Sequence, residues 1–257
     1  MSTTRVKRIA LFTGVGIVAY LFFLALTLPA SMLFRWVLPA DGAVAVIAPQ
    51  GTPWNGKAHQ LQVNGAMLGR VSWSVHPWEL FTGKLDYDLR VHGAATDLSG
   101  EAVLTPGGKI VVTNVHGPLD LTPALGWLHL PPDSATGRVI FDLDRFVMTD
   151  NHPTALIGRI SVDHLHAQWP QPMDLGGYVA TFTTDANGII HGRAHDSGGP
   201  IDLDATVTVS KNGQYQCRGA MTARGNAAPG LKQALGFLGR TDNSGTTHFA
   251  FSGRLAI

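Results

Sequence analysis

One apolar run near the N-terminus most constrains what this chain can become. Residues 9–28 contain no charged side chain, and the next charge comes only at Arg35. In a helix that rises about 1.5 Å per residue, about 20 apolar residues cross a bilayer core of about 30 Å. Basic residues precede the run, and basic flanks stay on the cytoplasmic side of a membrane. The sequence therefore predicts a transmembrane helix over 9–28, with residues 1–8 in the cytoplasm.

A cleaved signal peptide is the alternative interpretation of this run. Signal peptides have apolar regions of about 7–15 residues that lead to a small-x-small cleavage site. Here the apolar character continues to Phe34, and the nearest candidate site, Pro29-Ala30-Ser31, fits that pattern poorly. An uncleaved anchor is therefore the favoured interpretation. Under both interpretations the bulk of the chain lies on the far side of the membrane.

Beyond the anchor we expect a connector over residues 29–50 and a β-rich domain over 51–257. Charged residues make up 14% of the chain, well below the usual share of about 25%, and the net charge is +1. Such a balance provides no basic field for nucleic acid, so no nucleic-acid partner is expected. The single cysteine, Cys217, excludes a cysteine-ligated zinc module.

Alternation of apolar and polar residues predicts the strands of this domain. Its clearest example is 201–209, where apolar residues at odd positions alternate with Asp and Thr at even ones. Segments 71–75, 85–91 and 139–143 show the same period of two. One dry face and one wet face indicate a mostly antiparallel sheet. We therefore expect a mainly β fold, namely an N-terminal transmembrane helix followed by a curved, repetitive antiparallel sheet with short helices.

Two stretches of the chain, Ser99–Leu128 and Ile201–Leu238, follow one plan of strand, glycine turn, strand and short helix. The short helices are expected at Thr122–Leu128 and Pro229–Leu238. Stacking of equivalent units builds layered or curved structures. This interpretation gives two repeats, at about 51–130 and 137–257. Chance similarity within a glycine-rich β chain is the other explanation.

Residue patterns for chemistry are weak throughout the chain. The histidines lack a metal-site signature such as HExxH, and no nucleophile elbow or phosphate-binding glycine loop occurs. Paired aspartates such as Asp202 and Asp204 fall on the polar side of predicted strands, where a charge keeps the face wet. We therefore expect no catalytic residues, no cofactor, no metal and no enzymatic activity.

Four tryptophans are the candidate structural or interaction residues of the domain: Trp54, Trp73, Trp78 and Trp127. Trp54 lies in the run Gly51-Thr52-Pro53-Trp54-Asn55-Gly56, whose glycines, proline and asparagine predict a structured turn. A tryptophan requires an apolar site, so this turn is expected to pack back on the fold.

Ordered motifs across the exported part of the chain resemble those of the type II secretion system protein N family. They are Gly51-Thr52-Pro53-Trp54-Asn55-Gly56, Val71-Ser72-Trp73-Ser74-Val75-His76-Pro77, Leu80-Phe81-Thr82-Gly83-Lys84-Leu85, Gly213-Gln214-Tyr215, Leu235-Gly236-Phe237-Leu238-Gly239 and Ser252-Gly253-Arg254-Leu255. Their order and spacing carry the resemblance, and residues 131–172 show no match.

The resemblance implies a single-pass protein of the inner membrane with a cytoplasmic N-terminus and a periplasmic domain. Such a protein assists an assembly that exports folded proteins from the periplasm across the outer membrane. Its partners would be other type II secretion subunits in the envelope, and the resemblance implies no catalytic residues.

The alternative is an anchored periplasmic protein of the AsmA type that handles lipid. A curved sheet with an apolar concave face can hold acyl chains, so lipid is the partner in that case. The dry face of the sheet separates the two hypotheses. Side chains from short helices or from the other half of the sheet would make that face a core, whereas a continuous open apolar surface would fit lipid.

Overall fold

The computed structural model describes residues 27–32, 44–63, 65–75, 85–94, 96–105, 109–127, 131, 133–149, 152–168, 172–225 and 227–254. All but two residues of the predicted anchor at 9–28 lie outside these ranges, as do the predicted cytoplasmic residues 1–8. No helix within the described ranges is both long enough and apolar enough to cross a bilayer. The anchor and the domain boundaries drawn from it therefore stay predictions.

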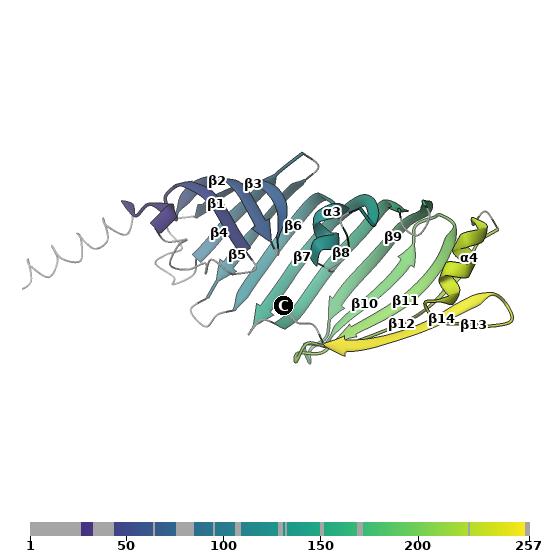
Figure 1. Cartoon of the computed structure of the whole chain (residues 1–257). Coiled ribbons are helices and arrows are strands. Elements are labelled where there is room, and N and C mark those ends of the chain that lie inside the picture. Colours follow the sequence, from purple (N-terminus) through teal and green to yellow (C-terminus); the bar gives the residue numbers. More distant parts are fainter. Residues whose placement is uncertain are drawn as a thin grey trace, which may run out of the picture.

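Fourteen strands form one antiparallel sheet in which each strand mostly lies next to its neighbour in the sequence (Figure 1). The strands are β1 (Val44–Gly51), β2 (Asn55–Val63), β3 (Ala66–Val75), β4 (Leu85–His92), β5 (Asp97–Leu104), β6 (Ile110–Asp120), β7 (Ala135–Thr149), β8 (His152–Ala167), β9 (Met173–Thr184), β10 (Ile190–Asp196), β11 (Ile201–Val209), β12 (Gln214–Ala223), β13 (Arg240–Thr241) and β14 (Thr246–Arg254). Only the last two exchange places, because β14 pairs with β12 and β13 lies outside it. The predicted mainly β, antiparallel fold is confirmed.

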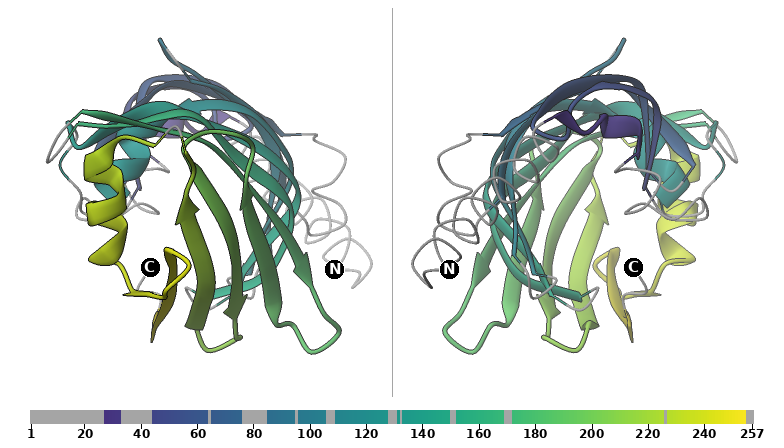
Figure 2. Two further views of the ribbon diagram at one scale, coloured as in Figure 1. Left: turned by 90° about the vertical axis from the view of Figure 1, so that its right-hand side faces the viewer. Right: turned by 90° about the vertical axis from the view of Figure 1, so that its left-hand side faces the viewer.

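The sheet curves into a gutter when it is viewed along its long axis (Figure 2). Register shifts interrupt the pairing of β5 with β6, of β7 with β8 and of β8 with β9. An extra residue in one strand bends that strand and increases its twist. Gly117 and Gly158 adopt φ values of 127° and 134° beside these irregularities, and a side chain at either position would meet the backbone of the neighbouring strand. The predicted curvature thus arises from bulges combined with glycines at close backbone approaches.

Two neighbouring rows of residues show how the two faces of the sheet differ in charge. Residues directly opposite one another on neighbouring strands share a face. One such row crosses the sheet on the convex side, and all of its residues are exposed: His116, Asp142, Arg159, Thr181, Arg193, Thr206, Arg218 and Ala250. The row beside it faces the other way and contains no charge: Val115, Leu143, Gly158, Phe182, Gly192, Val207, Cys217 and Phe251.

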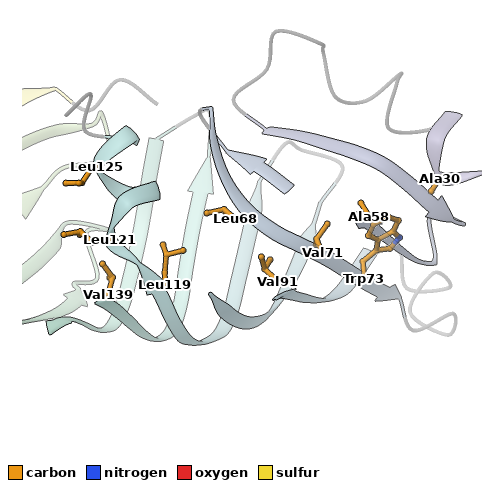
Figure 3. Close-up of a cluster of buried hydrophobic side chains, with 10 residues drawn as sticks. All are labelled: Ala30, Ala58, Leu68, Val71, Trp73, Val91, Leu119, Leu121, Leu125 and Val139. Carbon is orange, nitrogen blue, oxygen red and sulfur yellow. The ribbon is translucent and has the colours of Figure 1, made fainter. Parts of the chain in front are cut away.

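Two short helices pack on the concave side of the sheet, and each builds its own core (Figures 1 and 2). α3 (Leu121–Trp127) buries Leu121 and Leu125 against Leu119 and Val139 (Figure 3). α4 (Pro229–Gly236) buries Leu231 and Leu235 in a second cluster with Ile201 and Met221. Leucines four residues apart lie on the same face of a helix, so one face of each short helix becomes apolar.

Both predicted strand–strand–helix stretches are present in the structure. In the first, β5 and β6 lead into α3, and in the second, β11 and β12 lead into α4. The predicted helices are confirmed with slightly different bounds. The glycine turn predicted within the second stretch is formed by Lys211-Asn212-Gly213, which connects β11 to β12. The division of the whole domain into two repeats stays a prediction.

Candidate functional site

The turn between β1 and β2 contains the first of the predicted candidate residues, and several hydrogen bonds close it. The Thr52 N–H donates to the Asn55 carbonyl at 2.9 Å, and the Asn55 N–H donates to the Thr52 hydroxyl oxygen at 3.1 Å. Gly51 adopts φ 91°, and a Cβ there would lie 2.5 Å from the Asn55 carbonyl oxygen. Residues Gly51 to Gly56 therefore form a closed hairpin turn, as predicted.

Trp73, from β3, fastens this turn to the sheet. Its side chain is only 5% exposed and its ring covers Gly56, where a Cβ would lie 2.5 Å from the ring. Its indole N–H donates to the Thr52 carbonyl at 3.0 Å, and the Val75 N–H donates to the Trp54 carbonyl at 2.7 Å. A buried tryptophan needs such an acceptor for its N–H. Trp73 is therefore a core residue with a polar tie to the turn.

The segment 27–32 reaches the same cluster from the N-terminal side. Ala30 is fully buried and packs in the cluster that contains Ala58 and Trp73 (Figure 3). Trp54 is half-buried and Pro53, beside it in the turn, is buried. The site thus joins the chain that precedes the domain to the first three strands of the sheet.

The structure brings together two of the four predicted tryptophans, Trp54 and Trp73. Trp78 lies outside the described residues. Trp127 is the last residue of α3, and its side chain lies outside the described part of the chain. The role of all four tryptophans in interactions stays a prediction.

A half-buried ion pair that sequence reasoning missed lies on the concave face. The Arg224 guanidinium meets the Asp196 carboxylate at 2.8 Å, and the Asp196 side chain is only 9% exposed. The carboxylate also accepts the N–H groups of Leu203 at 3.1 Å and Gly198 at 3.2 Å. Arg224 in turn donates to the Gly199 carbonyl at 3.0 Å. The aspartate two residues before Gly198-Gly199 is a turn signal that could have located half of this cluster.

The electrostatics of this cluster follow from its burial and its hydrogen bonds. Burial disfavours the charged form of Asp196, but the hydrogen bonds from Leu203, Arg224 and Gly198 outweigh it and lower the pKa of the carboxyl. Hydrogen bonding to Asp196 raises the pKa of Arg224. Burial, aided by the charges of Asp196 and Asp174, raises the pKa of Tyr178 to about 12. The cluster stabilises the link between β10 and β11 and ties it to the end of β12.

Five of the nine histidines in the described ranges lie beside aspartates at the surface. The pairs are His92–Asp97 at 3.4 Å, His116–Asp142 at 2.8 Å, His166–Asp174 at 3.6 Å, His191–Asp185 at 3.3 Å and His248–Asp242 at 3.2 Å. Among the residues with described placement, no three His, Cys, Asp or Glu side chains come together as metal ligands would.

These features place the protein in the mainly β class, with a single-layer antiparallel sheet. Trp73 holds the first turn against this sheet, and two short helices pack on one of its faces. The chain belongs to the type II secretion system protein N family, because the sequence profile of that family matches residues 42–250. The resemblance seen in the sequence motifs is thereby confirmed.

Two relatives carry the name type II secretion system protein N. The protein from Aeromonas hydrophila is 24% identical, and the match covers 97% of this chain and all of that protein. The protein from Vibrio cholerae serotype O1 is 23% identical over 85% of this chain and 88% of its own length. No solved structure matches the chain significantly.

Replacement of Trp73 tests how much its contacts with the turn stabilise the fold. We expect Trp73→Ala to lower the free energy of unfolding by about 3–5 kcal/mol, because it empties a buried ring site. Trp73→Phe keeps a ring but loses the bond to Thr52, and should cost only about 0.5–1.5 kcal/mol beyond its smaller volume. Urea unfolding of the purified protein measures both. A loss below about 1 kcal/mol for the alanine variant would place the ring at the surface.

The Asp196 cluster should make stability depend on pH. Because the folded-state pKa lies below the ordinary value of 3.8, the carboxylate stabilises the fold above that value, and this is lost as the pH falls through the folded pKa. We therefore expect the wild type to have a higher free energy of unfolding than Asp196→Asn at about pH 7. This difference between the two proteins should be smaller at about pH 3.

Urea unfolding at the two pH values measures this difference. Asp204→Asn is the matched control, since Asp204 is 62% exposed and meets Arg193 at 3.1 Å on the convex side. An exposed pair of this kind contributes little, so the control should differ little from the wild type. If the difference in the free energy of unfolding between the wild type and Asp196→Asn is the same at both pH values, the charge of Asp196 does not provide the stabilisation.

Proposed function

We propose that this protein is a non-catalytic component of the type II secretion system that assists the export of folded proteins from the periplasm across the outer membrane. It is held in the inner membrane by residues 9–28, with its N-terminus in the cytoplasm and its β domain in the periplasm. Other type II secretion subunits are its partners. The observation that carries the proposal is the family match over residues 42–250, which spans nearly all of the folded part.

Three further observations support this proposal. The uncharged run at 9–28 follows basic residues, the arrangement expected of an anchor with a cytoplasmic N-terminus. The sheet is an open layer, and exposed strand edges can bind segments of other chains. The two relatives, which share the whole or most of their length with this chain, bear the name of a secretion-system protein.

Deletion of the gene tests the proposal. We expect enzymes that are normally secreted to accumulate in the periplasm, because export across the outer membrane would lack a component. The measurement is the activity of such an enzyme in the medium, the periplasm and the cytoplasm, with a resident periplasmic enzyme as the control for leakage and the restored gene as the control for specificity. Normal secretion in the deletion strain would overturn the proposal.

The handling of lipid is the second candidate function, and the apolar concave face of the sheet is the feature on which it rests. The two helices cover parts of this face, since they contact β3, β6, β7 and β12. Between them, Ala180, Phe182, Ala194 and Val207 are only half-buried. The face is therefore a core where the helices lie and a half-buried apolar surface between them.

The shape and chemistry of this surface suit an acyl chain. The row from Val115 to Phe251 and the row from Gly117 to Phe249 cross the same strands without a charge, over roughly 30–35 Å at about 4.8 Å per strand. An extended peptide laid on them would bring backbone N–H and C=O groups that these side chains cannot pair. A hydrocarbon chain brings none.

A charge placed on the concave face tests this second candidate. We expect Val207→Glu to weaken the binding of a fluorescent fatty acid to the purified protein by at least about tenfold, because a carboxylate in an apolar site must be desolvated. Thr206→Glu, one residue away on the convex face, is the matched control and should bind as the wild type does. If the wild type itself binds no fatty acid, lipid handling by this face is excluded.

A further inference from the structure

The two ends of the sheet are not equivalent as binding edges. β1 is the edge strand at one end, and its pairing with β2 skips Ala48, which adopts φ 52°. Pro49 follows and has no N–H to donate. A proline is one of the usual protections of an edge against an added strand. This edge is therefore interrupted in its middle.

The other edge is protected over only part of its length. β13 pairs with β14 at just two positions, Thr247 and His248. No strand of the described chain pairs with the outer side of β14 from Phe249 to Arg254, while the inner side is paired throughout with β12. Residues 250–254 are exposed and contain neither proline nor lysine.

Backbone groups of known residues point out of this open edge. A Cβ on Gly239 would collide with the His248 carbonyl oxygen, so that carbonyl points toward the β13 side. Alternate residues of a strand direct their N–H and C=O groups to the same side. Ala250, Ser252 and Arg254 therefore present their N–H and C=O groups outward, in the spacing that an extended chain requires.

The side chains along the edge determine which pattern of apolar and polar residues a bound strand would need. Phe251 is 48% exposed on the concave face and stacks on Phe249 at a centroid distance of 5.6 Å. On the convex face, Ala250 and Ser252 are exposed and lie opposite the polar residues Arg218 and Gln216 of β12. In a strand added here, side chains would alternate between the two faces of the sheet. Those on the concave face would pack against Phe251, and those on the convex face would lie in water.

We propose that the outer edge of β14, residues 249–254, binds an extended segment of another protein of the secretion system as an added strand. The segment would alternate apolar residues, packed on Phe251, with polar ones, and β13 would limit its length. This inference rests on the proposed role in secretion and names the surface through which that role is carried out.

A second copy of the chain fits the same edge less well. Continuation of the sheet from β14 of one copy to β1 of the next meets the interruption at Ala48 and Pro49. Pairing of two β14 edges would join six residues from each copy, far fewer than the roughly 20–30 residues per side of a stable interface. Short extended segments, by contrast, bind folded domains through edges of this size.

Removal of one outward N–H group tests the proposal in cells that carry the full-length protein. Ser252→Pro deletes an outward donor and leaves the bonds to β12 in place, and Ala250→Pro repeats the change at the next outward position. Ser252→Ala keeps the backbone donor and is the matched control. We expect each proline variant to reduce the enzyme activity secreted into the medium by about tenfold, the effect of one lost backbone hydrogen bond and its unpaired partner. Ser252→Ala should secrete normally.

The outcomes separate this proposal from the proposed function. If deletion of the gene blocks secretion but both proline variants accumulate in folded form and secrete normally, the edge proposal fails and the secretion role stands. If deletion leaves secretion intact, the secretion role fails. A concentration-dependent dimer that Ser252→Pro abolishes would make a second copy the occupant and overturn the proposal.

Amide hydrogen exchange tests the edge without any substitution, should the proline variants fail to fold. We expect the amides of Ala250 and Ser252 to exchange at least about tenfold more slowly in protein isolated with the other secretion subunits than in protein isolated without them, because an added strand would pair them. Equal exchange in the two preparations would overturn the proposal.

Discussion

A sheet of one layer must keep its apolar face out of water, and in the described part of the chain two short helices, α3 and α4, cover parts of that face. α3 and α4 each contribute a pair of leucines, Leu121 with Leu125 and Leu231 with Leu235, and each pair builds a separate core. The strands between these cores depend on cross-strand contacts within the face itself. Phe182 and Val207, for example, close over Gly192 from both sides. The placement of the helices therefore determines which part of the concave face is core and which part is half-buried surface.

Aromatic side chains laid over glycines recur in this sheet and replace part of a second layer. Trp73 covers Gly56 near the first edge, and Phe249 covers Gly219 near the last. A ring over a bare backbone buries apolar area without requiring another element above it. At Trp73 the same contact also fixes the first turn and the incoming segment around Ala30, so one side chain joins three parts of the chain.

Local patterns in the sequence were sufficient for the mainly β fold, the antiparallel pairing, both helices and the turn around Trp54. Period-two alternation and the Gly51–Gly56 turn depend on neighbouring residues only, so they can be read without the fold. The Asp196–Arg224 pair could not be found in that way, because 28 residues and two strands separate its members. The charge-free rows depend on register, which bulges shift by a residue at several places. The exposed edge at Phe249–Arg254 depends on how little of β14 is paired with β13.

Strand order in this sheet follows chain order from β1 to β12. A chain that emerges with its N-terminus first can therefore add each new strand to one that is already in place, with no long loop to close. β14 is the exception, since it must wait for α4 and β13 before it passes back beside β12. The last strand to join the sheet is thus also the strand whose outer side no described strand pairs with beyond His248. The position where this chain stops adding strands is therefore the position where a strand of another chain could be added.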